Sequence, residues 1–165
     1  MTDLGLLTQF ISLEIEQYYV GIKVIQSKYV AYLLLKFNMT EFKEAKFPFL
    51  SGVKLGEFGS SPLVDNSLYR KLVGSLLYLA HYRHELYYDV GVVASYMQEI
   101  HEIHWKDSKR ILHYVQGTKH FGVHDATSSP LELVGFAHSD WDGDSIKIKY
   151  TSGYVFMLEN GPIFW

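Results

Sequence analysis

The chain has 165 residues, with 15 Lys and Arg against 18 Asp and Glu, no Cys, and 48% hydrophobic residues. This composition excludes a disordered chain, a disulfide scaffold and a thiolate zinc site, and the formal net charge of -3 argues against a protein that holds nucleic acid by bulk charge. We expect an intracellular protein that is not secreted and not in a membrane, because the sequence shows no signal peptide and no apolar run that would cross a bilayer.

The N-terminal residues predict a β-hairpin. Apolar residues between Phe10 and Ile15 favour one strand, and residues 18–25 favour a second. Gly21 is the expected bend between them, since glycine tolerates the backbone angles of a tight turn.

A helix and then a linker follow the hairpin. Ser27 is the candidate N-cap of a helix that runs to Phe37 along one apolar stripe. Residues 47–62 lose this periodicity and contain several Gly, Ser and Pro residues, which predicts a linker or a long surface loop, and the linker is placed at residues 51–64.

Residues 65–120 predict a bundle of about three helices, each with apolar residues at helical spacing. The first of these helices is expected to begin at Asp65 or Ser67. The next two are expected to cover residues 85–97 and 103–115. Gly117 stands where a C-terminal cap is expected.

The last part of the chain predicts strands of an antiparallel sheet. The candidate strands are residues 121–124, 131–137, 153–158 and 162–165. The sheet is expected to be incomplete, because the sequence stops at Trp165 inside an apparent strand. The fold class is therefore α+β: an N-terminal hairpin plus helix, a central helical bundle, and an incomplete C-terminal sheet.

Two groups of residues resemble metal sites only in part. His101 and His104 lie three residues apart rather than the four of a zinc-protease helix, so solvated histidines at a helix start are expected. Asp140, Asp142 and Asp144 alternate as in a calcium loop, but the glycine and the final glutamate of that loop are missing. We expect an acidic turn there, and no metal site in either place.

Lys106, Lys109 and Arg110 share part of one face of the predicted fourth helix. Such a stripe is able to lie along nucleic-acid phosphates, although similar stripes are often simply solvated. RNA or DNA is thus a candidate partner through the helical segment, and the sequence gives no oligomeric state.

Several stretches are more specific than periodicity. They are Met1-Thr2-Asp3-Leu4-Gly5-Leu6-Leu7, Gln26-Ser27-Lys28-Tyr29-Val30, Tyr69-Arg70-Lys71-Leu72-Val73-Gly74-Ser75-Leu76-Leu77-Tyr78-Leu79, Ile103-His104-Trp105-Lys106, Lys109-Arg110-Ile111-Leu112, Ser139-Asp140-Trp141 and Thr151-Ser152-Gly153-Tyr154-Val155-Phe156. In this order and spacing they resemble the pol polyprotein of copia-type retrotransposons, across essentially the whole chain. The resemblance implies four segments: residues 1–50 as the end of the reverse transcriptase, 51–64 as a linker, 65–120 as a helical thumb- or connection-like segment, and 121–165 as a truncated ribonuclease H-like segment.

The resemblance also implies which catalytic groups to look for. The polymerase aspartates of the family lie upstream of the segment that matches Met1, and further nuclease carboxylates lie after the position of Trp165. The first metal-binding aspartate of the nuclease is replaced here by His138, and Asp140 is the nearest carboxylate. A neutral imidazole is a poor ligand for the Mg²⁺ of the parent family. Asp140 lies about 6.6 Å further along a strand, beyond a metal–oxygen bond of about 2.1 Å.

Three functions remain open at this point. The favoured one is a non-catalytic fragment or remnant of the polyprotein that carries no cofactor. The second is an excerpt of a full-length RNA-directed DNA polymerase and ribonuclease H. The third is a reused module that binds nucleic acid or protein.

Overall fold

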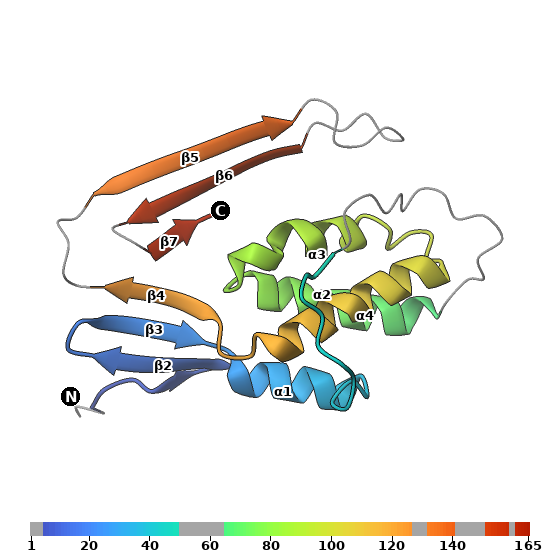
Figure 1. The fold of residues 1–165 in the computed structure, drawn as a ribbon, viewed down its shortest axis with the longest axis horizontal. Coiled ribbons are helices and arrows are strands. Elements are labelled where there is room, and N and C mark those ends of the chain that lie inside the picture. Colours follow the sequence, from blue (N-terminus) through green and yellow to red (C-terminus); the bar gives the residue numbers. More distant parts are fainter. Residues whose placement is uncertain (1–4, 50–64, 127–131, 141–150, 159–160) are drawn as a thin grey trace. The chain divides into compact units, whose positions relative to one another are not determined.

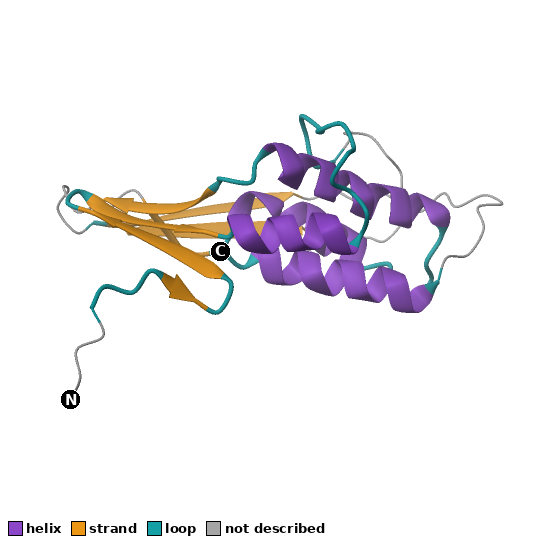
Figure 2. Ribbon diagram, turned by 90° about the horizontal axis from the view of Figure 1, so that it is seen from below, coloured by secondary structure: helices purple, strands orange, loops and turns teal. Residues whose placement is uncertain are grey.

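The computed structural model describes residues 5–49, 65–126, 132–140, 151–158 and 161–165. These residues form four α-helices, one short 3-10 helix and seven strands in two sheets, which confirms the predicted α+β class (Figures 1 and 2). The chain divides into two compact units: a sheet unit of residues 1–8, 15–24 and 123–165, and a helical unit of residues 9–14 and 25–122. The predicted linker at residues 51–64 lies outside the described residues.

The helical unit follows the predicted order with shifted boundaries. Its helices are α1 (Ser27–Lys36), α2 (Asn66–Ala80), the 3-10 helix η1 (His84–Leu86), α3 (Tyr87–Ala94) and α4 (Glu102–Gly117). The predicted helix over 85–97 is therefore wrong at both ends, because its first turn is a 3-10 helix and α3 stops at Ala94. No described helix is long and apolar enough to cross a membrane.

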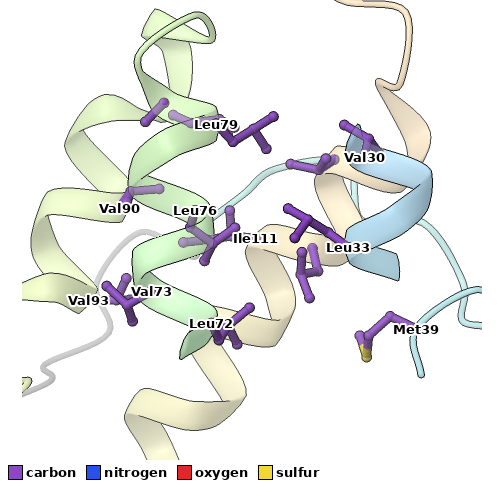
Figure 3. Close-up of a cluster of buried hydrophobic side chains, with 14 of the residues drawn as sticks. Val30, Leu33, Met39, Leu72, Val73, Leu76, Leu79, Val90, Val93 and Ile111 are labelled. Carbon is purple, nitrogen blue, oxygen red and sulfur yellow. The ribbon is translucent and has the colours of Figure 1, made fainter. Parts of the chain in front are cut away.

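One hydrophobic core joins all four helices (Figure 3). Its fully buried residues include Val30, Leu33, Met39, Leu72, Val73, Leu76, Leu79, Val90, Val93 and Ile111. Tyr69 is also buried, and its hydroxyl donates to the Val93 carbonyl at 2.6 Å, which ties α2 to α3. The division into segments 1–50, 65–120 and 121–165 stays a prediction, and in the structure α1 shares its core with the central bundle.

The two predicted N-caps had different outcomes. Of the two predicted starts of α2, Asp65 and Ser67, the structure has Asp65 as the cap, and its carboxylate accepts from the backbone N–H of Ser67 at 2.8 Å. Ser27 is not the cap of α1, because its hydroxyl donates to the Lys119 carbonyl. The Glu14 carboxylate accepts from the Lys28 N–H at 2.8 Å instead, an interaction that local sequence does not reveal.

The N-terminal sheet differs from the predicted hairpin in its turns. Its strand order is β1 (Gln9–Phe10), β2 (Leu13–Tyr18), β3 (Gly21–Ile25) and β4 (Gly122–Ala126). The predicted strand over 10–15 is interrupted, because Ile11 adopts a φ of 57° in a tight turn between β1 and β2. The turn between β2 and β3 falls on residues 19–20, so Gly21 begins β3 rather than forming the bend.

The second sheet contains β5 (Leu133–Asp140), β6 (Thr151–Leu158) and β7 (Gly161–Phe164), paired antiparallel in that order. The predicted strand at 121–124 exists as β4, but it lies beside β3 and not in this sheet. A hydrogen bond from the Ser27 hydroxyl to the Lys119 carbonyl at 3.1 Å joins the chain after α4 to the start of α1, just after β3.

Asp89 on α3 should make the stability depend on pH. Burial raises the pKa of Asp89 to about 6. Between roughly pH 4 and 6 the folded state therefore keeps a proton on Asp89 that the unfolded state has lost. The free energy of unfolding should fall as the pH rises through this range. Two pKa units correspond to about 2.7 kcal/mol, and solvent screening of a half-buried group reduces this to roughly 1–2 kcal/mol.

We expect Asp89→Asn to abolish this fall and to raise the free energy of unfolding at pH 7, as measured by urea unfolding at several pH values. Asp125→Asn, at an exposed position of β4, is the control. An unchanged pH profile in Asp89→Asn would contradict the assignment.

Candidate nucleic-acid interface

Helix α4 has a buried side and a basic side. Ile111, Leu112 and Val115 are fully buried in the core. Lys106, Lys109 and Arg110 lie on the other side, where Lys106 is exposed and the other two are half-buried. The three cations of the predicted stripe therefore share the outward side of one helix, since residues three and four apart neighbour one another on a helix.

The segment that follows α1 is attached to α4 by hydrogen bonds. It crosses α4 in Figure 1, and three bonds hold it there. The Ala45 N–H donates to the His113 carbonyl at 3.1 Å, and His113 Nδ1 donates to the Lys43 carbonyl at 2.9 Å. The Gln116 side chain donates to the Thr40 carbonyl at 2.9 Å. We call residues 40–46 the strap.

Gly117 has a different role from the one predicted. It is the last residue of α4, and Thr118 is the C-cap. A Cβ at Gly117 would lie 3.0 Å from Oε2 and 3.3 Å from Cβ of Glu44. The glycine is thus suited to the close approach of the strap, and its prediction as a helix cap is wrong.

The strap and α4 together line a shallow hollow with a volume of about 520 Å³. Its cationic residues are Lys43, Lys46, Lys106 and Arg110. The others are Glu44, Ala45, Asp107 and His113. We call this feature the α4 hollow.

The predicted basic residues do not all reach the α4 hollow. Lys106 and Arg110 line it, whereas the Lys109 ammonium lies 5.0 Å from the centre of the Trp105 ring. Sequence reasoning missed Lys43 and Lys46, which lie some 60 residues before α4. Their spacing from each other carries no signal, because a loop brings them to the helix through backbone hydrogen bonds.

The charges around the α4 hollow are unevenly paired. Lys106 forms an ion pair with Glu102 at 3.0 Å, one helical turn earlier. Asp107 Oδ2 and Arg110 Nε are both covered and have no hydrogen-bond partner among the described residues. Burial raises the pKa of the Asp107 carboxyl, and the nearby Arg110 guanidinium opposes that rise.

The prediction of solvated histidines at the start of α4 is wrong, because the His101 side chain is only 12% exposed and His104 is buried. This ring is fully buried and stacks on Tyr96 with 4.3 Å between centroids. Its Nδ1 accepts the backbone N–H of His101 at 3.0 Å, which completes a capping box. Among the residues that the structure describes, no group of three His, Asp or Glu is placed to hold a metal ion.

The residue at the nuclease position lies on β5. His138 is exposed and stands opposite Gly153 of β6, and Asp140 stands two residues further, opposite Thr151. The imidazole offers one neutral nitrogen where Mg²⁺ requires anionic oxygen, and glycine across the strand pair adds no side-chain ligand. The donors of the described residues around His138 therefore do not fit Mg²⁺. Asp142 and Asp144 lie outside the described residues.

Comparison with known proteins identifies relatives along the whole chain. The retrovirus-related Pol polyprotein from transposon RE2 of Arabidopsis thaliana is 33% identical over 94% of this chain, and the chain spans 11% of its length. An uncharacterized mitochondrial protein of A. thaliana, AtMg00810, is 30% identical over 100% of this chain, and the chain spans 68% of that protein's length. No protein-family model and no solved structure matches.

A third relative corrects the expected location. The secreted RxLR effector protein 161 of Plasmopara viticola is 35% identical over 62% of the chain, which spans 72% of that protein. The prediction of an intracellular protein that is not secreted is therefore contradicted, because similar sequences carry the names of secreted, mitochondrial and transposon proteins. The fold of this segment does not determine a compartment.

The names of these polyprotein relatives agree with the family that the sequence motifs predicted. The match to RE2 extends over 156 residues, so it covers both the helices and the second sheet. The chain therefore belongs to the pol polyproteins of copia-type retrotransposons, of which it is one segment.

Proposed function

We propose that this chain is a non-catalytic segment of the polyprotein whose helical unit binds RNA or DNA through phosphate groups. The observation that carries the proposal is the strap, which adds Lys43 and Lys46 to the Lys106 and Arg110 side chains of α4. The formal net charge of the whole chain is -3, so binding cannot come from the net charge and must come from this local group of cations. Cations that are concentrated on one surface attract phosphates even on an acidic protein.

Binding of this kind depends on salt. Each phosphate that a cation neutralises releases counterions, so the slope of log K against log salt is about -0.9 per neutralised phosphate on duplex DNA. Lys106 and Arg110 belong to the same surface, and replacing both should leave as many as two phosphates without a cation. The remaining binding should then respond less steeply to salt.

The test is a fluorescence-anisotropy titration of the full chain with a labelled RNA–DNA hybrid at several salt concentrations. We expect the Lys106→Ala/Arg110→Ala variant to bind about tenfold more weakly at low salt, with a slope reduced by about 0.9 for each phosphate that is no longer neutralised. Lys28→Ala on α1, whose side chain is 70% exposed, is the matched control and should bind as the unmodified chain does. Equal affinity of all three proteins would refute the proposed interface.

The non-catalytic part of the proposal rests on His138. An imidazole in place of the first nuclease aspartate cannot supply the anionic oxygen that bridges two Mg²⁺ ions. We expect no Mg²⁺-dependent cleavage of RNA in an RNA–DNA hybrid by this chain or by its His138→Asp variant, because one added carboxylate does not make a two-metal site. Gel analysis of the labelled RNA strand tests this, and cleavage that copurifies with the chain through two columns would contradict it.

A further inference from the structure

We propose that the α4 hollow is a binding site for one phosphate group of a nucleic-acid strand, with Arg110 as the principal ligand of the phosphate and Asp107 as a carboxylate that lowers the affinity. We call it the phosphate site. This inference rests on the proposed function, because it names the group that the same surface binds. It goes further because it predicts one defined phosphate site, rather than a general electrostatic attraction of phosphates along the helix.

Arg110 carries a polar atom without a partner in the part of the chain that the structure describes. Its Nε is covered and has no hydrogen-bond partner among the described residues, although its side chain lines the α4 hollow. A guanidinium has five N–H donors in a planar fork, which matches two oxygens of a phosphate. The covered Nε is closed to an incoming phosphate, so the terminal nitrogens of this partly exposed side chain are the donors that Arg110 offers in the α4 hollow.

The wall of the α4 hollow opposite the helix is formed by the strap. The strap places Lys43 and Lys46 across the α4 hollow from the helix, and hydrogen bonds from Ala45 and His113 fix its backbone. A wall that is ordered before binding reduces the entropy lost when the phosphate enters. Because the strap is fixed to α4, the backbone positions of Lys43 and Lys46 are set before a phosphate binds.

Asp107 is an acidic residue within this basic surface. It lies three residues before Arg110 on the same helix, and its Oδ2 is covered without a hydrogen-bond partner among the described residues. In the free protein it offsets part of the Arg110 charge, since their electrostatic coupling opposes the effect of burial. A bound phosphate would add negative charge beside this carboxylate, so Asp107 must weaken binding. Removing its charge should strengthen binding.

The test compares two conservative variants of the full chain in anisotropy titrations with the labelled RNA–DNA hybrid. We expect Asp107→Asn to bind the hybrid about three- to tenfold more tightly. Arg110→Lys keeps the charge but loses the planar fork, so we expect it to bind about three- to tenfold more weakly. Asp89→Asn and Arg70→Lys are the matched controls, because neither residue lines the α4 hollow, and both should bind as the unmodified chain does. Circular dichroism verifies that all four variants are folded.

Inorganic pyrophosphate distinguishes a nucleic-acid strand from a free phosphate compound as the source. Displacement of the hybrid from the unmodified chain, but not from Arg110→Lys, at the same pyrophosphate concentration would support the phosphate site. Hybrid binding that is unchanged in both Asp107→Asn and Arg110→Lys would overturn the phosphate site and leave the proposed function standing. No hybrid binding by the unmodified chain, with or without pyrophosphate binding, would overturn both.

Discussion

Replacing Arg83 by methionine is expected to lower the free energy of unfolding by roughly 2–4 kcal/mol. Arg83 is only 2% exposed and is the largest buried polar side chain among the residues that the structure describes. Its Nε forms an ion pair with Glu85 at 2.5 Å. Its terminal nitrogens donate to the carbonyl and the hydroxyl of Thr118, at 3.0 and 2.8 Å.

The size of this effect follows from what the arginine satisfies. The Thr118 carbonyl lies just after the end of α4, where helix carbonyls lack intrahelical partners and a cation is favourable. The Arg83 guanidinium also lies 5.5 Å from the centre of the Phe121 ring, which adds a cation–π interaction. Glu85 remains 29% exposed, so water is able to solvate its carboxylate in the variant and the destabilisation stays below that of a fully buried pair.

Urea unfolding followed by far-ultraviolet circular dichroism measures the effect. Arg70→Met is the matched control, because Arg70 is exposed on α2 and donates to a single carbonyl, that of Met97. Its destabilisation should be below about 1 kcal/mol. Arg83→Lys should recover little stability, since an ammonium cannot reproduce the forked hydrogen bonds. Equal unfolding midpoints for Arg83→Met and Arg70→Met would show that the buried hydrogen bonds contribute nothing.

The second large effect is expected from Leu76→Ala, which should cost about 2–5 kcal/mol. Leu76 is fully buried in the core that joins the four helices, and Figure 3 shows it among residues of α1, α2, α3 and α4. Truncation removes apolar packing and leaves a cavity that the packed helices cannot fill. The whole helical unit should therefore unfold at lower denaturant concentration.

The neighbouring residue provides the control. Leu77 is 36% exposed and lies on the same helix, so Leu77→Ala changes the same atoms with the same helix propensity. We expect it to cost less than about 1 kcal/mol in the same urea experiment. Similar destabilisation by Leu76→Ala and Leu77→Ala would contradict the placement of the core.

The local elements of this protein follow from patterns in adjacent residues. The apolar spacing in 27–37, 68–79 and 103–115 predicted three of the four helices, since a 3.6-residue repeat is a property of the segment itself. The Asp65 cap was equally visible, because its partners are two and three residues away. The third helix was less well predicted, because its η1 turn and early end do not alter the apolar pattern over 85–97.

The candidate site was predictable only on its helical half. Lys106, Lys109 and Arg110 lie within one turn and a half of α4, so their common face follows from helix geometry. Lys43 and Lys46 could not be added from sequence, since loop residues with no periodicity reach α4 through backbone hydrogen bonds with His113. Lys109 leaves the group because Trp105 offers its ring to the ammonium, which is a matter of side-chain conformation.

The sequence by itself determined the family, the α+β class and most helices and strands, because motif order, apolar periodicity and short-range caps are written in neighbouring residues. The tertiary structure alone decided that β4 joins the first sheet, that Arg83 and His104 are buried, and that the strap completes the α4 hollow. Each of these depends on groups from distant parts of the chain satisfying one another, and packing rather than local preference selects such partners.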